Sequence, residues 1–321
     1  MASLKLKRSM NTLLKDYICL NEDESILIVS DSKRQELSFN FFELAKKITT
    51  DSYYLEICDG LTEAEVLPSI IFESSKSVDS LLVVADIPIM DSKLIKKISS
   101  LGIKVGVLPS ISEDAFTRCM SVESDTIHET STKILSILQN ASMVRVEAKN
   151  GTNISLPIKN REVYAETGIL KKIGQTGYIP SGKVFVSPWD AKSNGIIIFD
   201  AYIEQIGVLK NAVKVEVENG IATKISGDGE EAKTLAKILN KHGEEARNVA
   251  EFGLGINNKA IISSDFFESE ISLGTCYIAF GKNISLGGNV DIPIRLSCVL
   301  EKPSIFIDDE YLINNGKYTI N

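Results

Sequence analysis

The chain has 321 residues, 44% of them hydrophobic and 24% charged, which is typical of a globular protein with one large or two compact domains. The formal net charge of -8 argues against unspecific binding to nucleic acid or to an anionic membrane surface. No apolar run approaches the roughly 20 residues that a transmembrane helix needs. Five cysteines without a CxxC spacing favour reduced thiols, and therefore a cytoplasmic location.

The first part of the chain alternates strand and helix signals. A short basic segment, KLKRSMNTLLK, is predicted to be a frayed helix. Continuous apolar strands are predicted at 24–31, 53–58, 80–86 and 104–110, with helices at 38–48, 62–76 and 91–102. Strands of this kind, separated by helices, predict a Rossmann-like parallel sheet that is covered on both faces. The turn after the first strand has no glycine, which argues against dinucleotide binding.

The pattern of apolar residues changes after residue 140. Alternating apolar residues flank the turn dipeptides Asn150-Gly151 and Asn219-Gly220, which predicts two hairpins. An amphipathic helix is predicted at 229–243, and a last hairpin at 304–318. We therefore expect an α/β protein with two domains, a Rossmann-like domain at 1–140 and an α+β domain at 141–321.

The stretch from Glu251 to Ser297 is the most distinctive part of the chain. Short apolar runs in it are separated by glycines, which predict sharp turns or close backbone approach and suggest a pocket. The glycines lie at 253, 255, 274, 281, 287 and 288, with Gly243 nearby.

The order of these residues resembles the C-terminal domain of the aminopeptidase T family of metallo-aminopeptidases. The resemblance is carried by AEFGLGIN at 250–257, by GTCYIAFGKN at 274–283 and by the glycine pair at 287–288. It implies an aminopeptidase-like fold over nearly the whole chain, and a homodimer. The resemblance also extends to an iron-dependent dihydroxypyridine dioxygenase.

The same resemblance implies that most metal ligands have been replaced. A metal-binding His of the family falls at Tyr277, a His-x-Asp pair falls at Arg295 and Ser297, and an earlier Glu falls at Lys183. Only Glu251 of the expected ligands remains. Two of the replacements are cations that would repel a divalent ion, so we expect no metal and no cofactor. The dioxygenase relative needs the same missing positions.

The chemistry of these residues supports an alternative use of the site. Lys183 and Arg295 are expected to neutralise Glu251, leaving a cation free to bind a carboxylate. The predicted ligand-binding residues are Arg295, Lys183, Glu251, Tyr277 and Ser297, and the candidate catalytic residues are Glu251, Tyr277 and Lys183.

Structural alternatives remain open for these residues. Lys183 is compatible with a solvated strand position, Tyr277 with core packing and Glu251 with a solvated helix end. The nearby acids at 265, 268, 270 and 291 could replace lost metal ligands.

Two histidines limit the possible chemistry. His128 and His242 are predicted on helices, so a His-rich metal cage is excluded. The favoured hypothesis is an aminopeptidase-like pseudoenzyme without its metal centre, which binds a peptide or amino-acid-derived ligand as an accessory protein in a peptide-modification or biosynthetic pathway. Two alternatives are a metal-independent enzyme that uses acid–base chemistry and a metallo-aminopeptidase with displaced ligands. Whether the protein is an enzyme stays open, although metallo-aminopeptidase activity is not expected.

Overall fold

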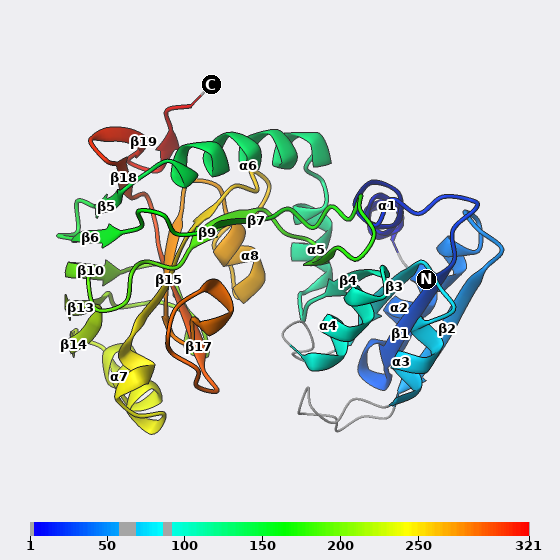
Figure 1. Ribbon diagram of the computed structural model, residues 1–321, viewed down its shortest axis with the longest axis horizontal. Helices are drawn as coiled ribbons and strands as arrows, with labels where there is room; N and C mark the ends of the chain where they lie inside the picture. Colours follow the sequence, from blue (N-terminus) through cyan, green and yellow to red (C-terminus); the bar gives the residue numbers. More distant parts are fainter. Residues whose placement is uncertain (1–2, 58–68, 86–91, 321) are drawn as a thin grey trace. The chain divides into compact units, whose positions relative to one another are not determined.

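The computed structural model describes residues 3–57, 69–85 and 92–320. The chain divides into two compact units (Figure 1). The first contains residues 1–128 and 166–181, and the second contains 129–165 and 182–321. The sequence suggested a single boundary near residue 140. The division differs because residues 166–181 return to the first unit, where a short strand joins its sheet.

The first unit is built on a five-stranded parallel sheet in the order β2-β1-β3-β4-β8. The strands are β1 (Ile26–Asp31), β2 (Ser52–Ile57), β3 (Ser80–Val84), β4 (Lys104–Leu108) and β8 (Thr176–Tyr178). The helices are α1 (Leu4–Thr12), continued by a π-helix at Leu13–Tyr17, then α2 (Gln35–Ala45), α3 (Ser69–Ser75), α4 (Lys93–Ser100) and α5 (Glu113–Cys119). Residues 62–68 of the helix predicted at 62–76 lie outside the described residues, and α3 forms within the rest of that range.

Alternating side chains explain why both faces of this sheet are covered. Ile26 and Ile28 of β1 belong to a core with residues of α1, α2 and α5, whereas Leu27 and Val29 belong to a core with residues of α3 and α4. Successive strand residues point to opposite faces, so continuous burial of β1 requires helices on both sides. The predicted Rossmann-like α/β class is confirmed.

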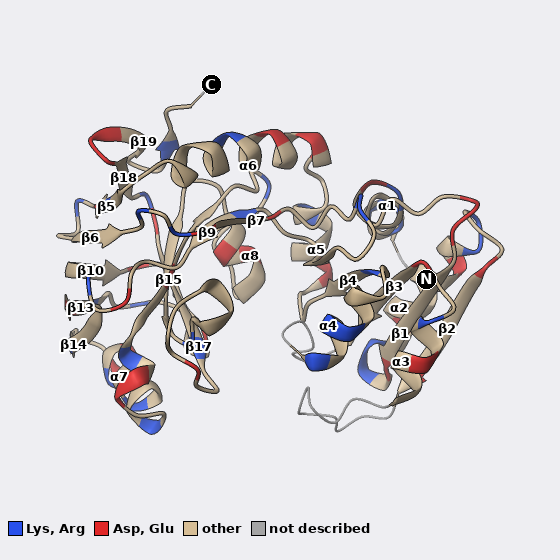
Figure 2. Cartoon of the chain, viewed as in Figure 1, with Lys and Arg blue, Asp and Glu red and all other residues tan. Residues whose placement is uncertain are grey.

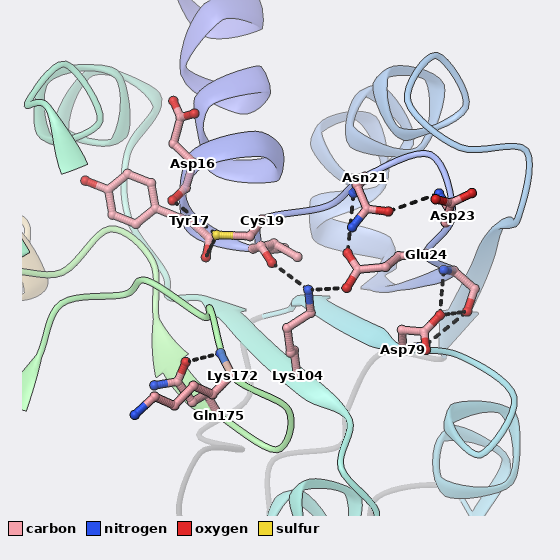
Figure 3. A network of polar contacts seen from close by, with 12 residues as sticks. Asp16, Tyr17, Cys19, Asn21, Asp23, Glu24, Asp79, Lys104, Lys172 and Gln175 are labelled. Atoms are coloured by element: carbon pink, nitrogen blue, oxygen red, sulfur yellow. Dashed lines mark hydrogen bonds and ion pairs between the residues drawn. The ribbon is translucent and has the colours of Figure 1, made fainter. Parts of the chain in front are cut away.

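The basic N-terminal segment is anchored, not frayed. Leu6 and Met10 of α1 are buried in the core, and the Ser3 side chain caps the helix by accepting a hydrogen bond from the Leu6 amide. Further along the sheet, the Lys104 ammonium is buried and donates to the Ile18 carbonyl and to Glu24 (Figure 3). These contacts join the end of the π-helix to β4.

The second unit contains two sheets. Helix α6 (Ser124–Gln139) begins in the first unit and continues into the second. An eight-stranded sheet has the order β14-β13-β10-β6-β5-β18-β19-β20, and a seven-stranded sheet has the order β12-β11-β17-β16-β15-β9-β7. The first contains β5 (Met143–Glu147), β6 (Asn153–Pro157), β10 (Asn194–Phe199), β13 (Val213–Glu218), β14 (Ile221–Ser226), β18 (Ser304–Ile307), β19 (Glu310–Asn314) and β20 (Lys317–Tyr318).

The seven-stranded sheet carries the stretch singled out in the sequence. Its strands are β7 (Val163–Glu166), β9 (Lys183–Val186), β11 (Tyr202–Ile203), β12 (Gly207–Val208), β15 (Val249–Gly255), β16 (Cys276–Gly281) and β17 (Arg295–Leu300). The remaining helices are α7 (Glu230–Lys241), along which acidic and basic residues mix in Figure 2, and α8 (Phe266–Ile271).

Both faces of the seven-stranded sheet are covered at its centre. The ring of Phe280 in β16 meets that of Phe199 in β10 edge to face, with centroids 6.1 Å apart, so the two sheets contact each other there. Helix α8 contacts β15 and β17. Every residue of β15 and β16 is buried, which accounts for the continuous apolar runs in the sequence.

Candidate functional site

The predicted site residues meet on one face of the seven-stranded sheet. Residues directly opposite each other in antiparallel strands share a face. The register pairs Glu251 with Ala279, Gly253 with Tyr277 and Ala279 with Ser297. Arg295 lies two residues before Ser297 on the same strand, and therefore on the same face. A β-bulge between Val249 and Glu251 precedes the acid.

Glycine at position 253 makes room for the Tyr277 ring. A Cβ atom built on Gly253 would lie 2.1 Å from the Cζ atom of Tyr277, far inside contact distance. Gly253 and Gly255 are extended residues of β15, so neither of them forms a sharp turn. Close backbone approach, the other use predicted for glycine, is what position 253 requires.

The charged side chains form one connected network, which we call the clamp: Lys183, Glu251, Glu270 and Arg295. The Arg295 Nε and Nη2 atoms donate to the two oxygens of Glu251, both at 2.9 Å. Nη2 also donates to Glu270 Oε1 at 3.0 Å, and Lys183 Nζ donates to Glu270 Oε2 at 2.6 Å. The Tyr277 hydroxyl donates to Glu251 Oε1 at 2.5 Å.

Burial makes this network electrostatically strong. The side chains of Glu251 and Glu270 are only 4% and 2% exposed, and that of Lys183 is 9% exposed. Burial alone would raise the pKa of Glu270, but Lys183 and Arg295 outweigh it and lower that pKa to about 2. Burial also favours the neutral form of Arg295, yet Glu251 and Glu270 hold its pKa well above the usual value. Glu270 and Arg295 are therefore both ionised at neutral pH.

Tyr277 stays protonated within the network. Burial raises the pKa of its hydroxyl well above the usual value, and the neighbouring Glu251 raises it further. The hydroxyl is thus a hydrogen-bond donor to Glu251, with its ring in a small core beside Tyr202 and Val299. Its burial agrees with the core-packing alternative for this residue.

A third acid lies beside the clamp. Glu204 follows β11 and accepts a hydrogen bond from the Ser297 amide at 2.9 Å. Burial raises the pKa of its carboxyl, although the Ser297 amide and Arg295 oppose the rise. The Ser297 hydroxyl is buried and has no hydrogen-bond partner among the described residues.

The structure places each predicted residue. Lys183 is buried in β9, not solvated, and Glu251 lies inside β15, not at a helix end. Lys183, Glu251, Tyr277 and Arg295 come together in one hydrogen-bonded group; their predicted roles in ligand binding and catalysis, and that of Ser297, stay predictions.

The network also includes residues that the sequence did not single out for this role. Glu270 was considered only as a replacement metal ligand, and Glu204 was missed. The signal available for Glu270 was its place in FFESEI, where two acids lie among three large apolar residues. Of the other acids considered, Glu268 accepts from the Ser263 hydroxyl and Asp291 pairs with Lys282.

The fold defines a class of α/β proteins with an open parallel sheet in the first unit and antiparallel sheets in the second. Wild-type AmpT from Thermus thermophilus has this fold, with a TM-score of 0.70 and 11% identity over 98% of this chain and 99% of that one. The 2,5-dihydroxypyridine dioxygenase from Pseudomonas putida KT2440 is also similar, with a TM-score of 0.86 and 17% identity over 100% of this chain and 99% of that one.

The sequence profile of the 2,5-dihydroxypyridine 5,6-dioxygenase (NicX) family matches residues 16–320 of this chain. The chain belongs to this family. Among curated proteins, none matches the sequence.

Family membership corrects the functional hypothesis. The aminopeptidase T resemblance holds as a relation of fold, but the family is named for an enzyme that acts on a dihydroxypyridine. The prediction of an aminopeptidase-like pseudoenzyme that binds a peptide is therefore wrong. A framework of glycines and strands specifies a fold and not its chemistry, so the resemblance indicated the fold and misled about the activity.

The residues present do not fit the iron that a ring-cleaving dioxygenase of this kind draws on. Non-haem iron oxygenases hold the metal with two histidines and a carboxylate. His128 lies in α6 and His242 at the end of α7, and neither belongs to the sheet face that carries the clamp. Within residues 3–57, 69–85 and 92–320, no group of three or more His, Cys, Asp or Glu side chains is arranged to hold a metal. The clamp acids are already bonded to cations.

Two other sequence expectations concern location and thiols. No helix in the described part of the chain is long and apolar enough to cross a membrane.

Cys19, Cys119, Cys276 and Cys298 are free thiols, and burial raises the pKa of both Cys276 and Cys298. These two cysteines are therefore buried and protonated, not reactive.

Proposed function

We propose that the protein is an enzyme that acts on a small hydroxylated pyridine, or on a closely related hydroxylated heteroaromatic ring, bound at the exposed edge of Arg295. The observation that carries this proposal is the division of the guanidinium group into two edges. One edge is fixed by two buried carboxylates, and the other is accessible. Family membership supplies the class of substrate.

The accessible edge of Arg295 is suited to an anionic oxygen. The Arg295 side chain is 28% exposed, and its Nη1 atom makes no hydrogen bond within the described residues. Two donors on Nη1 are therefore available, and charge-assisted bonds from a guanidinium to an oxyanion are strong and directional. The planar group also stacks on aromatic rings. An ionised ring hydroxyl satisfies both preferences.

Glu251 and Glu270 orient this anchor. Three hydrogen bonds hold the Nε and Nη2 atoms, so the guanidinium plane is fixed before a ligand arrives. Pre-organisation of this kind lowers the entropic cost of binding.

Glu204 is the group we assign to proton transfer. Its raised pKa brings the carboxyl closer to neutral pH than an exposed glutamate, which is where a general acid or base is most effective. Hydroxypyridines exchange a proton between ring nitrogen and oxygen, so a substrate held by Arg295 offers protons that a neighbouring carboxyl can accept or return. The Ser297 amide holds one oxygen of Glu204 and leaves the other for this exchange.

A substrate panel tests the proposal. Purified full-length protein would be titrated calorimetrically with 2,5-dihydroxypyridine, the monohydroxypyridines and a dipeptide, and incubated with each while ring absorbance and oxygen uptake are recorded. We expect binding and conversion of a hydroxypyridine and neither for the dipeptide. Conversion with oxygen uptake would extend to this chain the activity for which the family is named. Conversion without oxygen uptake would support the substrate class with another ring reaction.

Two variants assign the roles. Glu204→Gln is expected to bind the ring with less than about a threefold change while lowering its conversion by about 10²-fold or more, which is the usual size of a general acid–base contribution. Arg295→Lys is expected to weaken binding at least tenfold, because an ammonium cannot replace the bidentate edge. Failure of the unmodified protein to bind or convert any hydroxypyridine would contradict the proposal. The homodimer and the cytoplasmic location stay predictions, and size-exclusion chromatography tests the former.

A further inference from the structure

The clamp leaves no carboxylate oxygen free. Glu251 Oε1 accepts from Tyr277 and Arg295, and Glu251 Oε2 accepts from Arg295. Glu270 Oε1 accepts from Arg295, and Glu270 Oε2 accepts from Lys183. A metal ion that approached either acid would have to displace a charged donor at each oxygen it used.

The charges of the clamp also balance. Two carboxylates face one guanidinium and one ammonium, so the group is neutral as a whole. A buried neutral group of this kind has no excess negative charge with which to attract a divalent ion, and each of its cations repels one at short range. The hydrogen bonds and the net charge of the clamp therefore both argue against the binding of a divalent ion.

We infer that Lys183 and Arg295 act as built-in counter-cations for Glu251 and Glu270, and that the protein consequently takes no divalent metal at these two carboxylates. The fixed cations do for the acids what a bound metal would otherwise do: they neutralise them and hold them in place. It follows that removal of both cations turns the pair into a divalent-cation site of oxygen ligands, suited to Mn²⁺ or Mg²⁺. The inference concerns metal affinity alone, so it stands or fails independently of the proposed substrate.

The unmodified protein provides the first test. Full-length protein, purified without chelator and then dialysed, would be titrated with Fe²⁺ under anaerobic conditions and with Mn²⁺, and its metal content measured. We expect any binding to be unchanged, within a factor of about two, in the Glu251→Gln and Glu270→Gln variants. Binding of one equivalent at micromolar concentration that either variant abolishes would overturn the inference.

Variants that remove the cations provide the second test. The double variant Lys183→Met with Arg295→Met is expected to gain at least 100-fold in affinity for Mn²⁺, and addition of Glu270→Gln should cancel the gain. Lys214→Gln with Lys224→Gln is the matched control, because it strips both cations from Glu216 at the surface. No gain in the folded clamp variant, or an equal gain in the control, would contradict the inference. If the double variant fails to fold, the comparison of the unmodified protein with the two glutamate variants still decides.

Discussion

Two groups of charges in the second unit differ in what surrounds them. In the clamp, the acids are at most 4% exposed and each is held by more than one donor. On the eight-stranded sheet, Glu216 of β13 pairs with Lys214 and Lys224, but these side chains are 30% to 65% exposed. The same chemical groups thus lie once in a protein interior and once in water. Only the first should have a large effect on folding, because water already solvates the second.

Removal of Arg295 should have the largest effect. Arg295→Met leaves two buried carboxylates without their shared partner, and breaking a buried pair from one side costs about 3–5 kcal/mol. We expect that loss in the free energy of unfolding, measured in urea. A loss below about 1 kcal/mol would mean that water reaches the acids and that the clamp resembles the surface group.

Acid should weaken the clamp over a defined pH range. The pKa of Glu270 is lowered to about 2 in the folded protein from its ordinary value of 4.5. The stabilisation that Glu270 contributes is therefore complete above about pH 4.5 and is lost as the pH falls towards 2. A shift of this size corresponds to roughly 3 kcal/mol at most. Unfolding in urea at a series of pH values should show this slope, and Glu270→Gln should reduce it. An unchanged slope in the variant would assign the acid sensitivity to other groups.

Extra volume beneath Tyr277 should have a smaller effect. In Gly253→Ala, the new methyl group would overlap the Tyr277 ring, and overpacking costs about 1–3 kcal/mol. Gly253→Ala combined with Tyr277→Leu should recover part of the loss, because the overlapping ring is gone. Equal stability of Gly253→Ala and the unmodified protein would contradict the close approach of the ring to β15.

The surface group should change least. Lys214→Gln removes one of two exposed partners of Glu216, and we expect the urea midpoint to stay within error of the unmodified protein. Added salt should leave this result unchanged, since the pair is already screened by water. A clear loss of stability would remove the contrast between the two groups.

The strands and the hairpin were predicted well because they depend on residues that are close together in the sequence. The apolar strands and the hairpin at Asn219-Gly220 followed from continuous burial and from two residues with positive φ, 48° and 75°. The return of residues 166–181 to the first sheet could not be predicted in this way, since β8 has only three residues and pairs with β4 far away in the sequence.

The candidate site was predictable only in part, because some of its contacts depend on tertiary packing. The resemblance brought Lys183 and Arg295 to the positions of former metal ligands beside Glu251, and their opposite charges predicted the ion pair that Arg295 and Glu251 form. The second partner, Glu270, lies on a six-residue helix whose position depends on tertiary packing. Nothing in the residues near Glu204 indicated its contact with the Ser297 amide. The activity was mispredicted because a shared framework of glycines and strands specifies a fold and leaves the chemistry undetermined.

A double-mutant cycle tests the central claim, that Arg295 and Glu270 stabilise the fold as a buried pair. Stability in urea would be measured for the unmodified protein, Arg295→Met, Glu270→Gln and the combination. We predict a coupling energy of at least about 2 kcal/mol, because the second substitution removes a carboxylate that the first has left without its partner. Additive effects, within about 0.5 kcal/mol, would contradict the account.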